Sequence, residues 1–210
     1  MRVIKEYDER RNEILNAAEE LFHMKGFDRC TVNDILKEVG IARGTFYHYF
    51  NSKEEVLDAI VCRYKETVVK RSHEILNKDS ISCEEKLLRV FMAMRIDDQA
   101  ESRMIEEMHK TENALLHQKT LNAMVTAMAP ILAKIIEEGI EKDVWSCRYP
   151  LEYMQIFLAS SLTLTDEGIF ELDDESQMKV MAALISILEK MLSVTEDSFM
   201  ELFMQYQGQM

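Results

Sequence analysis

Apolar residues recur every three or four positions along most of the chain, which is the spacing of one helix face. The first such run predicts a helix over residues 8–25, with Gly26 as a left-handed helix end. Shorter runs predict a second helix over 32–39, ending at Gly40, and a third over 43–49. We find no alternating strand pattern and no repeat. The pattern therefore predicts an all-α fold.

Helix-start signals divide the following part of the chain. Thr31 begins a capping-box pattern, with an acidic residue three positions later. Ser52 and Glu55 form a second box, which opens a long helix predicted to reach about residue 77. Ser82 opens a third box at the next helix. These caps indicate that helices continue well beyond the first 50 residues.

Two prolines and one aspartate mark a helix interior and two helix starts in the second half of the chain. Pro130 lies within the helical pattern of residues 101–142, and we expect it to kink this helix or to mark a seam there. Pro150 is well placed as the first residue of another helix. Asp174, followed by Gln177, is expected to cap the last long helix.

Composition limits the class of protein. The 210 residues suffice for one small and one larger domain, and two prolines and six glycines are few breakers. No apolar run approaches 18 residues, so we expect no membrane span. The charged start MRVIKEYDERR lacks the apolar stretch of a signal peptide, so a cytoplasmic location is expected. The four cysteines form no CxxC pair, which excludes the common zinc and redox motifs.

Charge is distributed unevenly along the chain. The net charge is −13, yet residues 1–71 hold 13 basic and 13 acidic side chains. Residues 72–210 hold the other 12 basic and 25 acidic side chains. The change of composition near residue 75 indicates a change of role. Because the first part carries no net charge, it is compatible with binding to nucleic acid.

Two short helices joined by a tight turn, and braced by a third, predict a helix-turn-helix. The second helix of this motif lies in the major groove of DNA. Phe46 and Phe50 are four residues apart, so we expect both on the buried side. That arrangement leaves Thr45, His48 and Tyr49 outward, with Tyr47 at the flank. A purely structural role explains the two phenylalanines but not the adjacent tyrosines and histidine.

The chemistry of this segment suits a groove lined with phosphates. Tyrosine hydroxyls, cations and backbone N–H groups at helix N-termini bind phosphate oxygens, and Thr, His and Arg can contact bases. A glycine lets the DNA backbone come close. The expected DNA contacts are Thr31, Arg43, Gly44, Thr45, Tyr47, His48, Tyr49 and Lys53.

The segment TVNDILKEVGIARGTFYHYFNSKEEVL resembles the N-terminal signature of the TetR family of bacterial transcriptional repressors. The resemblance covers about residues 10–60, and its core GTFYHYFxSKE is specific. It implies nine or ten helices, a homodimer, a palindromic operator and a C-terminal domain that binds an inducer. The eight DNA contacts above are carried over by position. Ala42 departs from the serine that the family often has there, which weakens the helix cap by about 1 kcal/mol.

These observations predict two domains. Residues 1–52 form a helix-turn-helix DNA-binding domain, whose brace helix continues to about residue 77. Residues 53–210 form a helical ligand-binding and dimerisation domain.

Apolar stripes on the last two long helices suit a four-helix interface between two subunits. The alternative is that these stripes face the core of their own subunit. The interface candidates are Met154, Phe157, Ser161, Met181, Ile185, Leu188 and Leu192.

Methionines are frequent in the middle helices, and their thioethers adapt to varied apolar ligands. Ordinary core methionine is an equally good interpretation of each. The ligand candidates are Met92, Arg103, Met104, Met108, His109, Met124, Met128 and Phe157. Glu106, His109 and Glu112 share a helix side but lack a fourth ligand, so we expect no metal. The only small molecule expected is an unidentified effector.

The sequence predicts a DNA-binding protein, and the resemblance implies a repressor that a small-molecule inducer releases from a palindromic operator. One alternative is a factor of the same fold controlled by a protein partner or by no ligand, with an architectural or cell-division role. Activation instead of repression also remains open. An enzyme is not expected, because paired carboxylates, nucleophile motifs and phosphate loops are missing.

Overall fold

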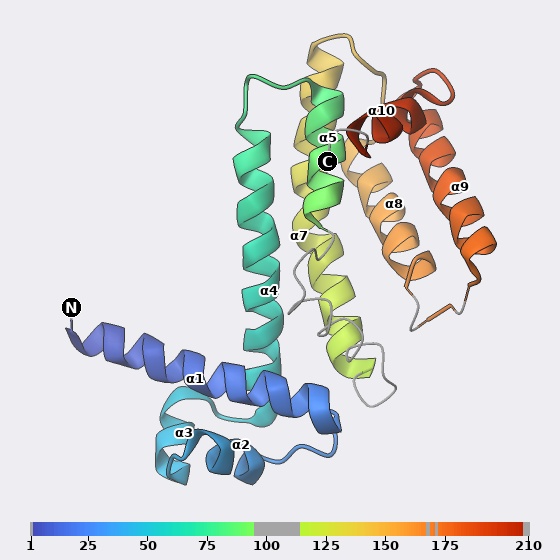
Figure 1. Cartoon of the computed structure of the whole chain (residues 1–210). Helices are drawn as coiled ribbons and strands as arrows, with labels where there is room; N and C mark the ends of the chain where they lie inside the picture. Colours follow the sequence, from blue (N-terminus) through green and yellow to red (C-terminus); the bar gives the residue numbers. More distant parts are fainter. Residues whose placement is uncertain (1, 95–113, 167–168, 171, 208–210) are drawn as a thin grey trace. The chain divides into compact units, whose positions relative to one another are not determined.

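The computed structural model describes residues 2–94, 114–166, 169–170 and 172–207 (Figure 1). These residues form helices without any strand, which confirms the all-α prediction. None of the described helices is both long and apolar enough to cross a membrane. The helices are α1 (Arg2–Lys25), α2 (Val32–Val39), α3 (Arg43–Tyr49), α4 (Lys53–Leu76), α5 (Cys83–Ala93), α7 (Ala114–Glu141), α8 (Pro150–Leu164), α9 (Asp174–Leu192) and α10 (Ser198–Gln207).

The chain divides into two compact units. The first comprises Met1–Lys65 with Asp97–Thr120, and the second comprises Glu66–Ile96 with Leu121–Met210. Two helices, α4 and α7, contribute residues to both units. The first unit therefore contains the complete helices α1 to α3 together with the first half of α4.

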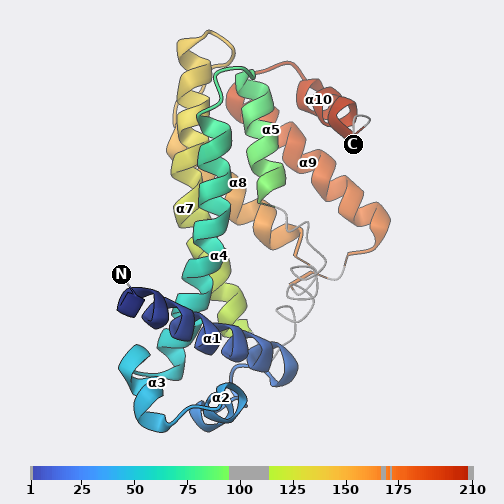
Figure 2. The ribbon, with the colours of Figure 1, turned by 60° about the vertical axis from the view of Figure 1, so that its left-hand side comes forward.

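The first unit is organised by α1, which lies over α2 and α3 (Figures 1 and 2). Its buried face carries Ile14, Ala18 and Phe22, as the spacing predicted. The helix begins at Arg2, however, and not near residue 8 as expected. Nearly two additional turns of helix therefore precede the apolar stripe that revealed it.

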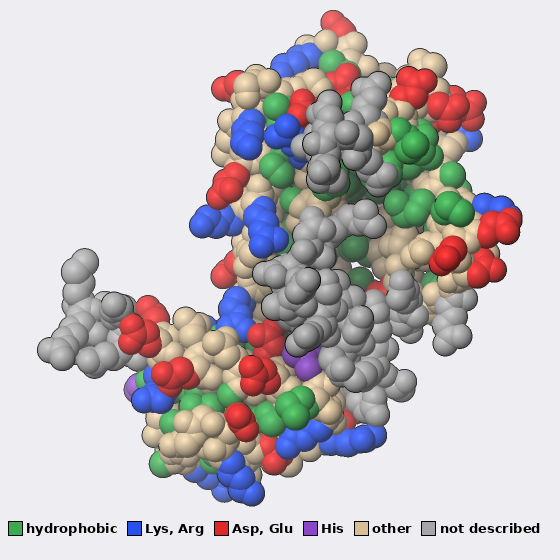
Figure 3. Space-filling view, in the orientation of Figure 1, with side chains coloured by type: hydrophobic (Ala, Val, Ile, Leu, Met, Phe, Trp, Pro, Cys, Tyr) green, Lys and Arg blue, Asp and Glu red, His purple; other side chains and the backbone are tan. Residues whose placement is uncertain are grey.

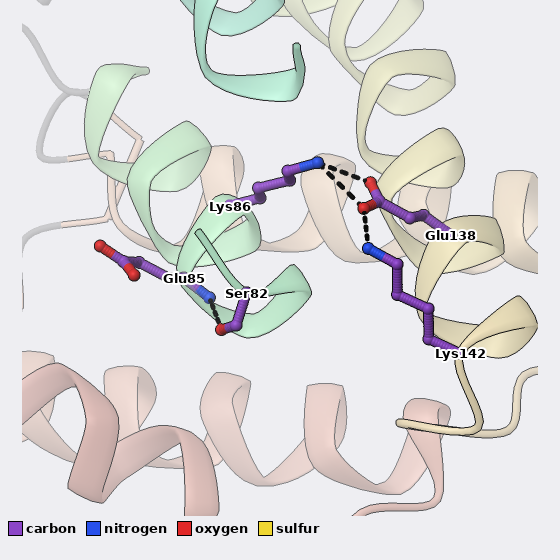
Figure 4. Close-up of polar contacts among 5 residues, drawn as sticks. All are labelled: Ser82, Glu85, Lys86, Glu138 and Lys142. Carbon is purple, nitrogen blue, oxygen red and sulfur yellow. Dashed lines mark hydrogen bonds and ion pairs between the residues drawn. The ribbon is translucent and has the colours of Figure 1, made fainter. Parts of the chain in front are cut away.

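The predicted helix starts are mostly present, with two corrections. The Glu85 amide donates to the Ser82 hydroxyl at 3.2 Å, as expected (Figure 4). At the start of α4, the Glu55 amide donates to the Ser52 hydroxyl at 3.2 Å, as predicted. The Glu55 carboxylate, however, accepts from the amide of Asn51 at 2.7 Å, one residue before the predicted partner. The cap of α9 is Asp173, one residue before the predicted position. The extended backbone of Asp173 directs its carboxylate toward the amide of Ser176.

The second unit is built around α7, whose residues Met128, Leu132 and Ile135 are fully buried. Helix α7 continues through Pro130, whose side chain is exposed. Because a proline cannot donate a hydrogen bond to the carbonyl four residues earlier, the expected kink or seam at this position stays a prediction. The stretch of this predicted helix before Ala114 lies outside the described residues.

The link between α7 and α8 is held against the core by Trp145. Its indole Nε1 donates to the Ile136 carbonyl at 2.7 Å. Gly139 makes this contact possible, because a Cβ atom there would lie 2.1 Å from the indole.

The start of α10 is anchored to α9. The buried carboxylate of Glu189 accepts a hydrogen bond from the amide of Phe199 at 2.9 Å.

A buried ion pair joins α5 to α7 (Figure 4). Lys86 is only 2% exposed, and its Nζ lies 2.9 Å from each carboxylate oxygen of Glu138. Lys142 donates to the same carboxylate at 2.6 Å. Partial burial raises the pKa of Glu138, but the hydrogen bonds from Lys142 and Lys86 outweigh this effect and lower it. The Glu138 carboxylate is therefore ionised at neutral pH.

Candidate DNA-binding surface

The helix-turn-helix is formed by α2 and α3. Gly40 ends α2 with a φ of 72°, and its amide bonds the Leu36 carbonyl at 3.0 Å. This left-handed conformation costs glycine nothing, and it turns the chain sharply toward α3. Ala42 lies at the start of α3 and gives no side-chain hydrogen bond, as expected from the missing serine hydroxyl.

The two faces of α3 differ in burial. Phe46 and Phe50 are at most 1% exposed, as predicted. Tyr47 is 46% exposed. The guanidinium carbon of Arg43 lies over its ring, 5.9 Å from the ring centroid. His48 is also exposed. The helix therefore presents a polar and aromatic face outward, next to Lys and Arg side chains visible along the edge of this unit (Figure 3).

Two smaller candidates complete this face. Gly44 is exposed, and a Cβ atom added there would meet no atom within 4 Å. Thr45 is half-buried beside it. Packing inside the subunit therefore does not require a glycine at position 44.

Thr31 is already engaged within the subunit. Its hydroxyl donates to the Asp34 carboxylate at 2.7 Å, and its amide donates to the same oxygen at 2.8 Å. Lys25 contributes an ion pair at 3.0 Å. The Thr31 hydroxyl, then its amide and Lys25, hold the pKa of Asp34 well below its usual range. A carboxylate thus lies at the start of α2, where we expected a phosphate.

Lys53 also has a role that the sequence did not indicate. Its Nζ donates to the Phe27 carbonyl at 2.7 Å and lies 4.0 Å from the centroid of the Phe27 ring. One of its three N–H groups is therefore used to tie the start of α4 to the turn after α1. The remaining two are the ones that a phosphate contact would use.

Tyr49 differs from the expectation that it points fully outward. It is half-buried, because Tyr7 of α1 lies against it with ring centroids 4.6 Å apart. Sequence reasoning missed Tyr7, since the predicted helix began one residue after it. The available signal was its position seven residues before Ile14, which places both on one helix face.

The ligand candidates that can be placed lie in the interior of the second unit. Met124, Met128 and Phe157 are buried, and Met92 is half-buried. The Phe157 ring lies 5.3 Å from that of Phe91. Four candidates lie outside the described residues: Arg103, Met104, Met108 and His109. Among the described residues, no three potential ligands gather at a metal site.

The interface candidates divide into two groups. Four of them, Met154, Phe157, Leu188 and Leu192, are buried within the subunit. Their burial agrees with the alternative that these stripes face the core of their own subunit, and α8 packs against α9. Ser161 and Ile185 are half-buried, while Met181 is exposed.

The sequence analysis missed two exposed apolar side chains on the same two helices, Ile156 of α8 and Ile187 of α9, which are 55% and 44% exposed. Met178, which belongs to the predicted apolar stripe of α9, is 66% exposed. Apolar side chains are visible in the region of α8 to α10 in Figure 3. An exposed apolar surface of this kind marks a candidate contact surface.

Two segments of the chain match models of known protein families. Residues 14–60 match the family described as bacterial regulatory proteins, tetR family. Residues 98–187 match the family described as tetracyclin repressor-like, C-terminal domain. The chain belongs to the TetR family. The helix-turn-helix of α2 and α3 lies within the first match.

Individual relatives match part of the chain. The chain is 35% identical over 117 residues to the HTH-type transcriptional regulator TtgR of Pseudomonas putida, covering 53% of this chain and 55% of TtgR. It is 36% identical over 84 residues to the HTH-type transcriptional repressor KstR2 of Mycolicibacterium smegmatis, covering 40% of each. The matches therefore span about half of these relatives or less.

Solved structures extend the likeness to almost the whole TetR-family fold. RolR in complex with resorcinol has a TM-score of 0.61 at 15% identity, covering 94% of each chain. GusR from Salmonella enterica has a TM-score of 0.61 at 19% identity, covering 88% of this chain and 95% of GusR. At these identities the likeness shows a common fold.

Proposed function

We propose that this protein is a transcriptional repressor that binds a palindromic DNA operator as a homodimer and is released by a small-molecule inducer. The observation that carries this proposal is the orientation of α3. Its phenylalanines are buried, while Tyr47 and His48 are exposed beside Gly44. A short helix with this division of faces suits insertion into a major groove.

The exposed residues of α3 divide into two roles. Tyr47 and Arg43 lie at the flank, where a hydroxyl and a guanidinium bind phosphates and fix the orientation of the helix. Thr45 and His48 contact base edges. Gly44 allows the DNA backbone to approach, since an added Cβ would project into open space.

The homodimer uses the exposed apolar residues of α8 and α9. Met178 and Met181 are three residues apart on α9, so they lie on one face of the helix, and both are exposed. Ile187 of α9 and Ile156 of α8 are exposed at other positions of the same two helices. A two-fold interface repeats this surface on both subunits. The two α3 helices then read half-sites about 34–36 Å apart, one turn of B-DNA.

The inducer binds in the second unit, beside the buried side chains of Met124, Met128 and Phe157. One solved structure of the same fold, RolR, contains the small phenol resorcinol. The helix α4 begins directly after the helix-turn-helix and extends into the second unit, so it provides a covalent path between them. An inducer acts only if it binds the DNA-bound and free states unequally.

The decisive experiment selects preferred sequences from a random DNA pool with the full-length protein. His48→Ala is expected to change the preferred bases at one or two positions, with about 1–3 kcal/mol lost per base pair. Tyr47→Phe should weaken binding to all sequences alike, because it removes a phosphate contact. If neither variant alters DNA binding, α3 is not the reading helix.

Induction is tested separately on the selected operator. A panel of small phenols, beginning with resorcinol, is titrated into the complex of protein and operator. An effector that lowers operator affinity supports the repressor mechanism. Unchanged affinity across a broad panel would favour control by a protein partner, and it would leave the DNA-binding proposal intact.

A further inference from the structure

We propose that Tyr7 of α1 is a positioning residue for DNA recognition, because it orients His48 and Tyr49 of α3. The inference rests on the proposed function, since it assigns His48 and Tyr49 to the DNA-facing surface. It adds a residue outside the helix-turn-helix to the determinants of sequence preference. Tyr7 acts through the other two rings.

Three rings from two helices form one aromatic cluster. The centroids of Tyr7 and Tyr49 lie 4.6 Å apart with an interplanar angle of 36°. Tyr7 and His48 lie 5.7 Å apart at 82°, an edge-to-face arrangement. His48 and Tyr49 lie 5.1 Å apart, also at 82°. Each ring therefore contacts both others at distances typical of aromatic pairs.

The position of Tyr7 follows from one continuous face of α1. Tyr7, Arg11, Ile14 and Ala18 follow one another at intervals of three or four residues, so they lie on one side of the helix. Ile14 and Ala18 are fully buried and fix this side against the core. Arg11, one turn after Tyr7, lies 5.1 Å from the Phe50 ring at the end of α3. The first turns of α1 are thus held along α3.

This contact has a consequence for recognition. His48 is exposed, and an exposed histidine without neighbours samples several side-chain rotamers. Contacts with Tyr7 and Tyr49 on two sides restrict that sampling before DNA arrives. A side chain already held in its binding orientation loses less entropy on binding, and it discriminates better between correct and incorrect bases.

A direct phosphate contact from Tyr7 is the competing explanation, since its side chain is 37% exposed. The two roles depend on different atoms. Positioning requires the ring, whereas a phosphate contact requires the hydroxyl group. Tyr7→Phe keeps the ring and removes the hydroxyl, and Tyr7→Ala removes both.

The test measures the affinity of full-length variants for the selected operator and for operators with single base-pair changes. Positioning predicts that Tyr7→Ala reduces the discrimination at the His48-dependent base pairs by about tenfold, within the range of a single base contact. Tyr7→Phe should retain the wild-type preference. In the double variant with His48→Ala, the effects should not multiply, because both changes act on one contact. Asn12→Ala, at an exposed position of α1, is the matched control, and thermal melting verifies that each variant is folded.

Three results would overturn the inference. Equal weakening on every operator by Tyr7→Ala and Tyr7→Phe would identify a hydroxyl–phosphate contact. Unchanged discrimination in Tyr7→Ala, while His48→Ala does alter it, would refute positioning and preserve the proposed function. If His48→Ala also had no effect, the assignment of α3 would fail together with the inference.

Discussion

Two glycines in helices of this protein meet different surroundings. At Gly44, an added Cβ meets nothing within 4 Å, whereas at Gly139 it would lie 2.1 Å from the Trp145 indole. Gly139 is therefore required by packing inside the subunit. Gly44 has no such internal reason, so its reason is sought outside the subunit, in the close approach of DNA.

Replacing Gly44 with Ala separates folding from binding. The helix should be as stable as before, or more stable by up to about 1 kcal/mol, because alanine favours helix. Operator affinity should fall at least about tenfold, since the new methyl group projects toward the DNA backbone. Chemical denaturation and operator titration measure the two effects.

Gly139→Ala is the contrasting control, because its methyl group displaces the indole and should cost about 1–3 kcal/mol of stability. Gly44→Ala protein that binds the operator normally would show that DNA does not approach this position.

Among the elements, α2 depends on the cap formed by Thr31 and Asp34. The hydroxyl and amide of Thr31 both donate to the Asp34 carboxylate, and Lys25 pairs with it. The cap therefore combines hydrogen bonds with charge. It also places a negative charge near the DNA-binding surface, where Lys25 offsets it.

The depressed pKa of Asp34 makes this cap sensitive to acid. Because the folded-state pKa lies below the unfolded value of about 3.9, the carboxylate stabilises the fold fully above that pH. This stabilisation is lost as the pH falls through the folded pKa. The difference in melting temperature between wild type and Asp34→Asn should therefore be largest near neutral pH and shrink in acid.

Asp28→Asn, which removes a charge at an exposed position outside the cap, is the matched control in the same melting series. A wild-type advantage over Asp34→Asn that stays constant from pH 7 to strongly acidic conditions would contradict the role of the charge.

The contact between α5 and α7 also depends on a charged pair. Lys86 is almost completely buried, and Glu138 is its charged partner. Glu138→Gln leaves the ammonium buried without an anion and should cost on the order of 3 kcal/mol. Lys86→Met removes the buried charge and keeps the apolar stem, so its cost should be smaller. Denaturant unfolding measures the free energy of unfolding of each variant. A larger loss of stability in Lys86→Met than in Glu138→Gln would refute this account.

At the scale of the whole molecule, charge and apolar surface are segregated. The first 71 residues are neutral overall, and the acidic excess lies entirely in the rest. An acidic second part is repelled by DNA, so it favours contact through the helix-turn-helix alone. Exposed apolar side chains gather instead on α8 and α9, which suits contact with another subunit.

The proposed homodimer predicts a specific effect of charge on this surface. Changing both Met178 and Met181 to Glu places four carboxylates at the two-fold interface. Repulsion and desolvation should raise the dimer dissociation constant by about 100-fold or more. Analytical ultracentrifugation would then show monomers at micromolar concentration, with much weaker operator binding.

Met24→Glu provides the control for this change, because Met24 is 82% exposed on α1 in the first unit. It should leave the dimer intact. If the α9 double variant remains dimeric, the subunits meet through another surface.

The sequence by itself determined the helical class, the boundaries of α2 and α3, and the capping of α2 by Thr31. These features depend on neighbouring residues, because helix periodicity, a left-handed glycine and a capping box all act within a few positions. The burial of Phe46 and Phe50 was equally predictable from their spacing of four. The polar face of α3 followed from the same spacing.

Only the tertiary structure decided which residues from distant segments meet. Tyr7 against Tyr49, Lys53 with the Phe27 carbonyl and Lys86 with Glu138 each join different parts of the chain. The apolar stripes on α8 and α9 could not be assigned from the sequence for the same reason, since Met154 and Leu192 are buried while Met181 is exposed. Periodicity identifies an apolar face, but what covers that face depends on how whole helices pack together.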